Sequence, residues 1–350
     1  MRRPPTRTVI MIVVAALIIG SGVLTMPRPP KLSTQVAGDR GLIDQVRQRL
    51  GPGPHDRLSV AVIDHDQVRT ARFGADEDDS YEIGSVTKTF TGSLFAIALE
   101  RGEVRHDTRL SELLDVGDGP VGDITLRQLA TQSSGLPRLP TGVLNTLRTV
   151  ISALRADDPY PQDPATLIEE ARRASVGEKR YLYSNFGMSL LGAALAAAAD
   201  TDYQSLVSQR ITGPLHLGST RPGTADDPHI GYTASGRPSA NWVMGAYSGA
   251  GGLRSTLPDM ITYIRAQADG SAPGADALRP IAPAGKQRIG YAWMTTTTVG
   301  GGTITWHNGG TGGFTSFVGF DRDAGRAVVV LNNTATSVDD LAVGLLEESS

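Results

Sequence analysis

Stretches with a β-strand pattern lie at both ends of this chain, and a long region of helical pattern separates them. Near the N-terminus, residues 58–63 and 68–73 are apolar-rich and Asp64-His65-Asp66 lies between them, which is typical of a hairpin. Near the C-terminus, four more strands are expected at residues 289–296, 302–306, 315–320 and 327–331. Consecutive hairpins pair antiparallel. Strands from the two ends can share one sheet only if the region between them folds as a separate lobe.

That intervening region alternates helical stretches with proline and glycine breaks. Helices are expected at residues 126–131, 143–154, 165–174 and 205–211, and an alanine-rich helix ends near Ala199. Two more helices, at 41–50 and 338–347, flank the strands. We therefore predict an α+β fold: an antiparallel sheet of about five or more strands, flanked by N- and C-terminal helices, with a large helical lobe of about residues 85–240 inserted. A functional site is expected in a cleft between the two lobes.

Composition excludes several kinds of site. The chain has no cysteine, so it has no disulfide, cysteine nucleophile or zinc–thiolate centre. Its formal net charge of −3 gives no reason to expect nucleic acid as a partner. The six histidines are scattered without the spacing of metal ligands, so we expect no metal and no other cofactor.

A serine and a lysine three residues apart, in Ser85-Val86-Thr87-Lys88, lie at the start of a further predicted helix and share one of its faces. In Ser-x-x-Lys hydrolases the lysine amine can take the proton of the serine hydroxyl. The chain has only four lysines among 33 basic residues, and lysine, unlike arginine, can lose its proton when desolvated. The motif alone is weak, because a helix-capping serine followed by a solvated lysine has the same pattern.

Two other short motifs occur farther along the chain. Tyr183-Ser184-Asn185 precedes the alanine-rich helix, and a core tyrosine beside a turn asparagine would explain it equally well. His307-Asn308-Gly309 shares its His-x-Gly pattern with His216-Leu217-Gly218. We expect His307 to end a strand and to open a glycine-rich run, Gly309 to Gly313, where backbone N–H groups can approach a ligand closely.

Taken in order, these motifs resemble the serine β-lactamase and penicillin-binding family, especially its class C-like branch of β-lactamases, D-aminoacyl peptidases and esterases. The resemblance runs from about Gly41 to the last helix. Five blocks carry it: Glu82 to Gly92, Ser134 to Pro137, Tyr183 to Asn185, Gly251 to Thr256, and His307 to Gly310. One block departs from the family, because typical β-lactamases have Lys-Thr-Gly or Lys-Ser-Gly where this chain has His-Asn-Gly. The lysine and hydroxyl that help to hold a β-lactam carboxylate are therefore missing.

The resemblance implies a β-lactamase/transpeptidase-like fold and an acyl-enzyme mechanism. Ser85 would be the nucleophile, and Lys88 and Tyr183 would share the proton transfers, either with Lys88 neutral as the base or with Lys88 charged and Tyr183 as the base. The backbone N–H groups of Ser85 and of Gly310, which follows Gly309 of the third motif, would form the oxyanion hole. The other two implied site residues, which would contact or orient the substrate, are Asn185 and His307.

Three activities are consistent with that mechanism. We expect an esterase or a D-alanyl or D-amino-acid peptidase that acts on a small molecule or a peptide, such as one derived from the cell wall. The alternative is a β-lactamase, which the His-Asn-Gly departure disfavours. A second alternative is a penicillin-recognising sensor or binding protein that is acylated once and hardly turns over.

The N-terminus carries an uncharged run from Val9 to Met26, preceded by three arginines. As a helix, its 18 residues would span about 27 Å, close to the roughly 30 Å of a bilayer's hydrocarbon core. The run is long for a signal-peptide core, and Gly20-Ser21-Gly22 is a poor cleavage site. We therefore favour a membrane anchor at residues 1–26 over a cleaved signal peptide, followed by a linker at 27–40 and an extracytoplasmic catalytic domain at 41–350.

Overall fold

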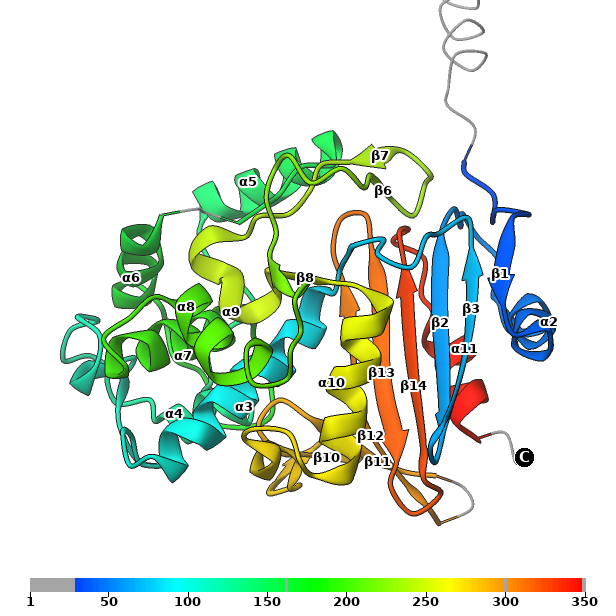
Figure 1. Cartoon of the computed structure of the whole chain (residues 1–350). Coiled ribbons are helices and arrows are strands. Elements are labelled where there is room, and N and C mark those ends of the chain that lie inside the picture. Colours follow the sequence, from blue (N-terminus) through cyan, green and yellow to red (C-terminus); the bar gives the residue numbers. More distant parts are fainter. Residues whose placement is uncertain (1–28, 161–162, 299–300, 348–350) are drawn as a thin grey trace, which may run out of the picture.

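A nine-stranded antiparallel sheet forms the centre of the protein (Figure 1). The computed structural model describes residues 29–160, 163–298 and 301–347. In spatial order the strands are β1 (Val36–Gly38), β3 (Gln67–Phe73), β2 (Leu58–Asp64), β14 (Arg326–Asn332), β13 (Thr315–Asp321), β12 (Thr303–Gly310), β11 (Met294–Thr297), β10 (Gln287–Ile289) and β9 (Ala282–Ala284). The N-terminal hairpin thus pairs with the C-terminal strands, as β2 lies beside β14.

Helices cover both faces of the sheet, because its central strands are apolar on both sides. On β14, Val328 and Val330 pack against α2 (Arg40–Arg49) and α11 (Asp339–Glu347). Val329 and Leu331, which point the other way, belong to a larger core shared with α10 (Leu257–Asp269) and the helical lobe. The sheet is therefore the wall between two hydrophobic cores.

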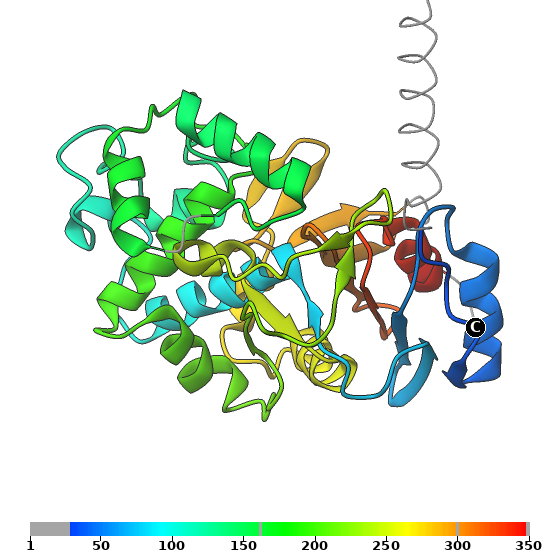
Figure 2. The same cartoon turned by 90° about the horizontal axis from the view of Figure 1, so that it is seen from above.

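The helical lobe is built around two buried helices, α3 (Thr87–Glu100) and α7 (Asn185–Ala198). Nearly every residue of both helices is buried, so other elements enclose them on all sides. The surrounding helices are α4 (Leu126–Ala130), α5 (Val143–Arg155), α6 (Pro164–Arg172), α8 (Tyr203–Val207) and α9 (Ser248–Gly251). Figures 1 and 2 show this lobe lying to one side of the sheet.

Two small sheets complete the fold. β4 (Tyr81–Glu82) and β5 (Arg221–Pro222) pair with opposite edges of β8 (Leu253–Ser255). This sheet places the residues before Ser85 beside the chain that follows α9. The hairpin of β6 (Gly231–Tyr232) and β7 (Pro238–Ser239) forms the second small sheet.

Several segments differ from the sequence prediction. The expected strand at 289–296 is two strands, β10 and β11, because the chain reverses between them: Ala292 has a φ of 67° and its N–H bonds to the Ala130 carbonyl. The expected strand at 302–306 continues to Gly310, so His307 lies within β12 rather than at its end.

Two other stretches, for which no helix or strand was predicted, are ordered. The glycine-rich stretch 245–252 forms a 3-10 turn and the short helix α9. The expected linker at 27–40 contributes β1, whose residues pair with β3 at the sheet edge. No helix within residues 29–160, 163–298 and 301–347 combines the length and apolar character needed to cross a bilayer, and the run from Val9 to Met26 lies outside the described residues.

Candidate active site

The structure brings Ser85 and Lys88 together at the N-terminal end of α3. Ser85 lies in a 3-10 turn, Gly84–Val86, and Lys88 lies in the first turn of the helix. Lys88 Nζ lies 2.9 Å from Ser85 Oγ and donates a second hydrogen bond to the carbonyl of Ala250 in α9. Ser85 is partly exposed, whereas Lys88 is completely buried. The two groups are therefore within reach of direct proton transfer.

Burial controls the charge of Lys88. Desolvation lowers the pKa of Lys88 well below its ordinary value, and the positive charge of Arg138 lowers it further. Within the described part of the chain, its amine bonds only to a hydroxyl and a carbonyl, and no carboxylate pairs with it. A buried amine without a counter-charge is stable in its neutral form, which is the form that accepts a proton.

Tyr183 lies just before α7, with its ring centroid 4.9 Å from Lys88 Nζ. Burial raises the pKa of Tyr183 above its ordinary value, and its hydrogen bond with Ser85 opposes this only in part. The hydroxyl therefore keeps its proton near pH 7. Of the two bases left open by the sequence, the geometry favours neutral Lys88, with Tyr183 as a hydrogen-bonding partner of Ser85.

Two glycines allow the end of β12 to lie against the serine turn. Gly84 has a φ of 49°, and a Cβ on it would lie 2.7 Å from the Gly310 nitrogen. A Cβ on Gly309 would lie 2.1 Å from the Ile83 carbonyl oxygen. Any side chain at either position would separate the two segments. Gly310 itself is exposed, so the strand end beside Ser85 is open to solvent.

His307 is buried on β12, with its ring centroid 6.4 Å from that of Tyr183. Burial lowers the pKa of His307 to about 3, so the imidazole is neutral. His307 Nδ1 lies 2.6 Å from the Asn308 carbonyl oxygen, and a carbonyl only accepts, so Nδ1 carries the hydrogen. Nε2 is then an acceptor. His307 thus supplies neither the positive charge nor the hydroxyl of the usual third motif.

A Ser-His-Asp triad is not formed around His307 within the described residues. Its Nδ1 is bonded to a backbone carbonyl rather than to a carboxylate. The neighbouring carboxylate, Asp339, instead accepts a hydrogen bond from the Asn308 side chain on the other face of the strand.

Asn185 is the first residue of α7 and is nearly buried. Its Nδ2 donates to the Tyr160 hydroxyl at 2.7 Å, while its Oδ1 is buried without a partner among the described residues. A buried carbonyl without a donor is costly. Asn185 therefore presents an acceptor that a substrate N–H could satisfy.

The sequence prediction missed three participants. Ala250 acts through a backbone carbonyl, which leaves no mark on the side-chain pattern. Tyr160 holds Asn185 from a loop 25 residues away. Arg138 directly follows the Ser-Gly-Leu-Pro block, its guanidinium lies 5.3 Å from the Tyr183 ring centroid, and its charge affects the pKa of both Lys88 and Tyr183.

Arg138 differs from most arginines of the protein. It is exposed, and among the described residues no carboxylate pairs with it. The site thus has an unneutralised positive charge at its rim. In residues 29–160, 163–298 and 301–347, no group of three or more histidine, aspartate or glutamate side chains could hold a metal ion.

Comparisons with known proteins identify the family of the chain. A sequence model of the beta-lactamase family matches residues 46–347. A human beta-lactamase-like protein is 29% identical over 250 residues, covering 62% of this chain and 47% of that protein. A beta-lactamase of Pseudomonas fluorescens is 27% identical over 223 residues, covering 59% and 58%. The chain thus spans about half the length of these curated relatives.

Solved structures show the same fold at lower identity. A structure described as a beta-lactamase/D-alanine carboxypeptidase from Pseudomonas syringae has a TM-score of 0.73 and 19% identity, covering 88% of this chain and 96% of that one. This likeness confirms the predicted α+β, β-lactamase/transpeptidase-like fold.

Proposed function

This chain belongs to the beta-lactamase family; we propose that it is a serine hydrolase of that family, which forms an acyl-enzyme on Ser85 and hydrolyses an ester or amide, as an esterase or a D-alanyl or D-amino-acid peptidase. One observation carries the proposal: the amine of a completely buried lysine lies 2.9 Å from the hydroxyl of Ser85. The proposed roles of the other residues follow from their distances to that pair.

In the acylation step, neutral Lys88 takes the proton of Ser85 as Oγ bonds to the substrate carbonyl carbon. The developing oxyanion is held by the backbone N–H groups of Ser85 and Gly310. The close approach permitted by Gly84 and Gly309 supports this arrangement. The bond to the leaving group then breaks and leaves an acyl ester on Ser85.

The leaving group needs the proton that Lys88 has taken. The Tyr183 hydroxyl is hydrogen-bonded to Ser85 and keeps its own proton near pH 7, so it can donate that proton to the leaving group and receive the proton of Lys88 in its place. Water then attacks the acyl ester, Lys88 accepts the proton of that water, and Ser85 recovers its hydroxyl. Asn185 Oδ1 would accept a hydrogen bond from a substrate amide.

The charges at the rim favour a substrate with a carboxylate. His307 is neutral and cannot replace the missing lysine of the third motif. Arg138 is exposed without a carboxylate partner among the described residues and lies beside Tyr183. A peptide ending in D-alanine carries its carboxylate near the scissile amide, and one structural neighbour is described as a D-alanine carboxypeptidase. This supports the peptidase over an esterase for neutral substrates.

The test of the nucleophile is covalent labelling. The protein and its Ser85→Ala variant are treated with a fluorophosphonate probe and with a fluorescent penicillin, and Ser111→Ala, which alters an exposed serine, is the matched control. We expect labelling of the protein and of the control, and none of Ser85→Ala. Equal labelling of Ser85→Ala would overturn the assignment.

Substrate class is tested by steady-state and burst kinetics with p-nitrophenyl esters, D-alanyl peptides and nitrocefin. Turnover of D-alanyl peptides is the expected outcome. Fast turnover of nitrocefin would instead favour the β-lactamase. Release of one equivalent with a negligible steady state would favour a sensor that is acylated once.

The location of the enzyme is a separate proposal. The uncharged run from Val9 to Met26 would anchor the chain in a membrane, with the catalytic domain outside the cytoplasm. It rests on the sequence of that run alone.

A further inference from the structure

Helix α5 (Val143–Arg155) has a row of apolar side chains that faces solvent rather than the hydrophobic core. Leu147, Val150, Ile151 and Leu154 recur at the spacing of one helix face and are 52%, 50%, 39% and 70% exposed. We call these four residues the apolar row. They make up half of the large hydrophobic residues that are exposed in the described structure. A helix normally turns such a row towards the core.

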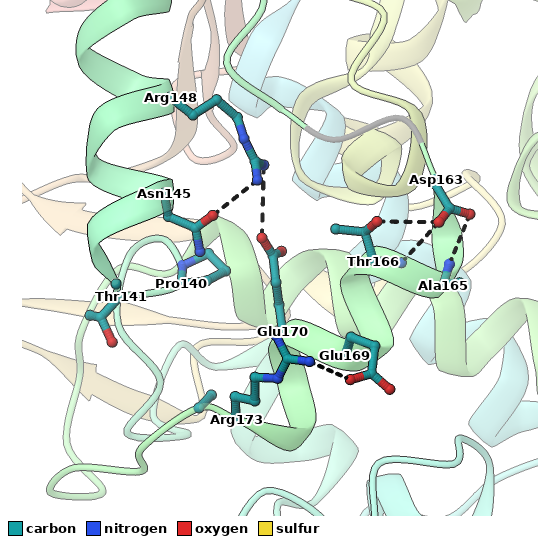
Figure 3. A pocket seen from close by; sticks show the side chains of 12 residues that line it. Pro140, Thr141, Asn145, Arg148, Asp163, Ala165, Thr166, Glu169, Glu170 and Arg173 are labelled. Carbon is teal, nitrogen blue, oxygen red and sulfur yellow. Dashed lines mark hydrogen bonds and ion pairs between the residues drawn. The ribbon is translucent and has the colours of Figure 1, made fainter.

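The opposite, inward face of α5 is polar, as Figure 3 shows. Arg148 donates to Asn145 Oδ1 at 3.0 Å, and its guanidinium lies 3.8 Å from Glu170 of α6. Together with residues of the α6 segment, Asn145 and Arg148 line a cavity of about 590 Å³. Ser152, one turn farther on, is buried. These contacts fix the rotation of the helix about its axis, and the apolar row therefore faces solvent.

The described chain begins on the same face of the molecule. Pro29 packs against the turn of the β6–β7 hairpin, since a Cβ on Gly236 would lie 2.6 Å from the Pro29 Cα. That hairpin is bonded to the end of α5: Arg237 donates to the Leu154 carbonyl at 3.2 Å. Figure 1 shows α5, this hairpin and the start of the described chain along the same, upper side of the molecule.

The distance to the run at 9–26 is short. Only Pro27 and Arg28 separate Met26 from Pro29, and three peptide steps reach at most about 11 Å. The interfacial layer on each side of a bilayer is roughly 5–8 Å thick. If the run is anchored in a bilayer, the face that carries Pro29 and α5 is therefore held at the lipid surface.

We propose that α5 is a second membrane contact, with its apolar row inserted at the boundary between the headgroups and acyl chains of the bilayer that holds residues 9–26. The row has the spacing of the apolar face of an amphipathic interfacial helix. Three exposed basic residues on this face, Lys31, Arg155 and Arg237, suit anionic headgroups, and one exposed carboxylate, Asp157, lies beside them.

Such a contact has a consequence for the substrate. Only residues 139–142 separate Arg138 from α5, so the start of the helix lies within about 18 Å of the free positive charge of the active site. An amphiphilic or lipid-linked anionic substrate lying on the bilayer would reach Ser85 without entering bulk water. The inference rests on the proposed anchor and on no property of the nucleophile.

The experiment uses the full-length chain, which has no native cysteine. Single variants Leu147→Cys and Ile151→Cys carry a nitroxide label and are reconstituted in vesicles of zwitterionic lipid with one quarter anionic lipid. Asp323→Cys is the control, because it lies in the exposed turn that precedes β14. The other end of β14, about 23 Å away, is the end that contacts the β6–β7 hairpin, so residue 323 lies far from the proposed membrane face. Collision with oxygen reports lipid, and collision with a nickel chelate reports water.

We expect the oxygen-to-nickel collision ratio at 147 and 151 to exceed that at 323 by about tenfold. Protein that floats with the vesicles but has equal ratios at the three sites would overturn this proposal and leave the anchor standing. Protein that does not float would overturn both. Protection that disappears on tenfold dilution of protein in lipid would assign the row to a second copy of the chain and also overturn it. Labelling of Ser85 by the fluorophosphonate, measured in the same samples, reports the proposed hydrolase independently.

A paired substitution supplies a second readout. Leu147→Gln with Leu154→Gln should leave thermal unfolding in detergent unchanged, since both side chains are exposed in the protein itself. Hydrolysis of a lipid-linked D-alanyl peptide in vesicles should fall several-fold, while that of a short soluble peptide should not. If the double substitution changed the rates on both peptides by the same factor, the proposal would be contradicted. Val68→Gln, which alters a 38% exposed valine of β3, is the matched control.

Discussion

Two basic side chains, Lys88 and Arg254, are completely buried, and their surroundings are opposite in kind. Lys88 bonds to the Ser85 hydroxyl and the Ala250 carbonyl, with no counter-charge among the described residues. Arg254 lies 3.3 Å from the carboxylate of Glu82 and 3.6 Å from that of Asp227. The Lys88 amine has no counter-charge and is neutral, whereas the Arg254 guanidinium keeps its charge and pairs with two carboxylates.

The contrast matters because the same two segments carry both groups. Glu82 precedes Ser85 by three residues on β4, and Arg254 follows Ala250 by four on β8. The ion pair between Arg254 and Glu82 therefore joins the strand before the nucleophile to the strand after the carbonyl that binds Lys88. The buried basic group with a counter-charge holds these two strands together, whereas the buried basic group without one is neutral and available to accept a proton.

The largest expected effect comes from removing the unpaired amine. Lys88→Met keeps the volume but cannot accept a proton, so kcat/KM should fall by about 10²–10⁴-fold. The free energy of unfolding should change by no more than about 1 kcal/mol, because two effects oppose each other. The variant no longer buries a polar amine, which stabilises it, but it leaves the Ala250 carbonyl without a hydrogen bond, which destabilises it. Acylation kinetics and urea denaturation measure the two quantities. Lys286→Met, at an exposed position, is the control and should alter neither.

A stable but active Lys88→Met would break the comparison, since the amine would then be dispensable for proton transfer. Large destabilisation with full residual activity per folded molecule would reverse the roles that we assign to the two cations.

The paired cation should show the opposite balance. Arg254→Met leaves Glu82 buried without a cation and leaves Asp227 with Arg221 as its only cation among the described residues, and we expect a loss of about 3–5 kcal/mol in the free energy of unfolding. Adding Glu82→Gln should recover part of that loss, because burial already raises the pKa of Glu82 to about 7 and an amide needs no counter-charge. Arg221→Met, which removes a cation that is 46% exposed, should cost under about 1 kcal/mol. If Arg221→Met and Arg254→Met cost the same, the buried pair is not the frame.

Much of this frame was predictable from local pattern, whereas the partners of the two buried basic side chains were not. Alternating and continuous apolar runs located the central strands, and the helix after Ser85 was placed correctly. The partner of Lys88 was beyond prediction because Ala250 lies 162 residues away and contributes only a backbone oxygen. The helix at 143–154 was predicted, but its outward apolar face was not, because spacing along a helix does not say which side meets the core.

The pH dependence of acylation distinguishes the two bases that the sequence left open. A base works only when unprotonated, so kcat/KM should rise tenfold per pH unit below the pKa of the base and level off above it. Burial lowers the pKa of Lys88 and raises that of Tyr183. If Lys88 is the base, kcat/KM should reach its plateau well below pH 10; if Tyr183 is the base, kcat/KM should still be rising above pH 10. His307, with a pKa of about 3, should add no step near pH 6.5. A profile from pH 4 to 11 on one substrate decides between them.

Arg138 provides the smallest and most specific test, because it is a third kind of cation: exposed, and without a carboxylate partner among the described residues. If Lys88 is unpaired in order to react, Arg138 is unpaired in order to bind, and its missing partner is the carboxylate of the substrate. Arg138→Gln should reduce kcat/KM about tenfold for peptides ending in a free carboxylate, equivalent to about 1.4 kcal/mol, and by under twofold for the same peptides as amides. Added salt should weaken the difference, since the group is exposed. Arg109→Gln, at a surface arginine that already pairs with Asp123, should leave both rates unchanged. Equal losses on the acid and the amide would mean that Arg138 acts only through Lys88 and Tyr183, and the charge at the rim would then belong to the proton-transfer machinery rather than to substrate recognition.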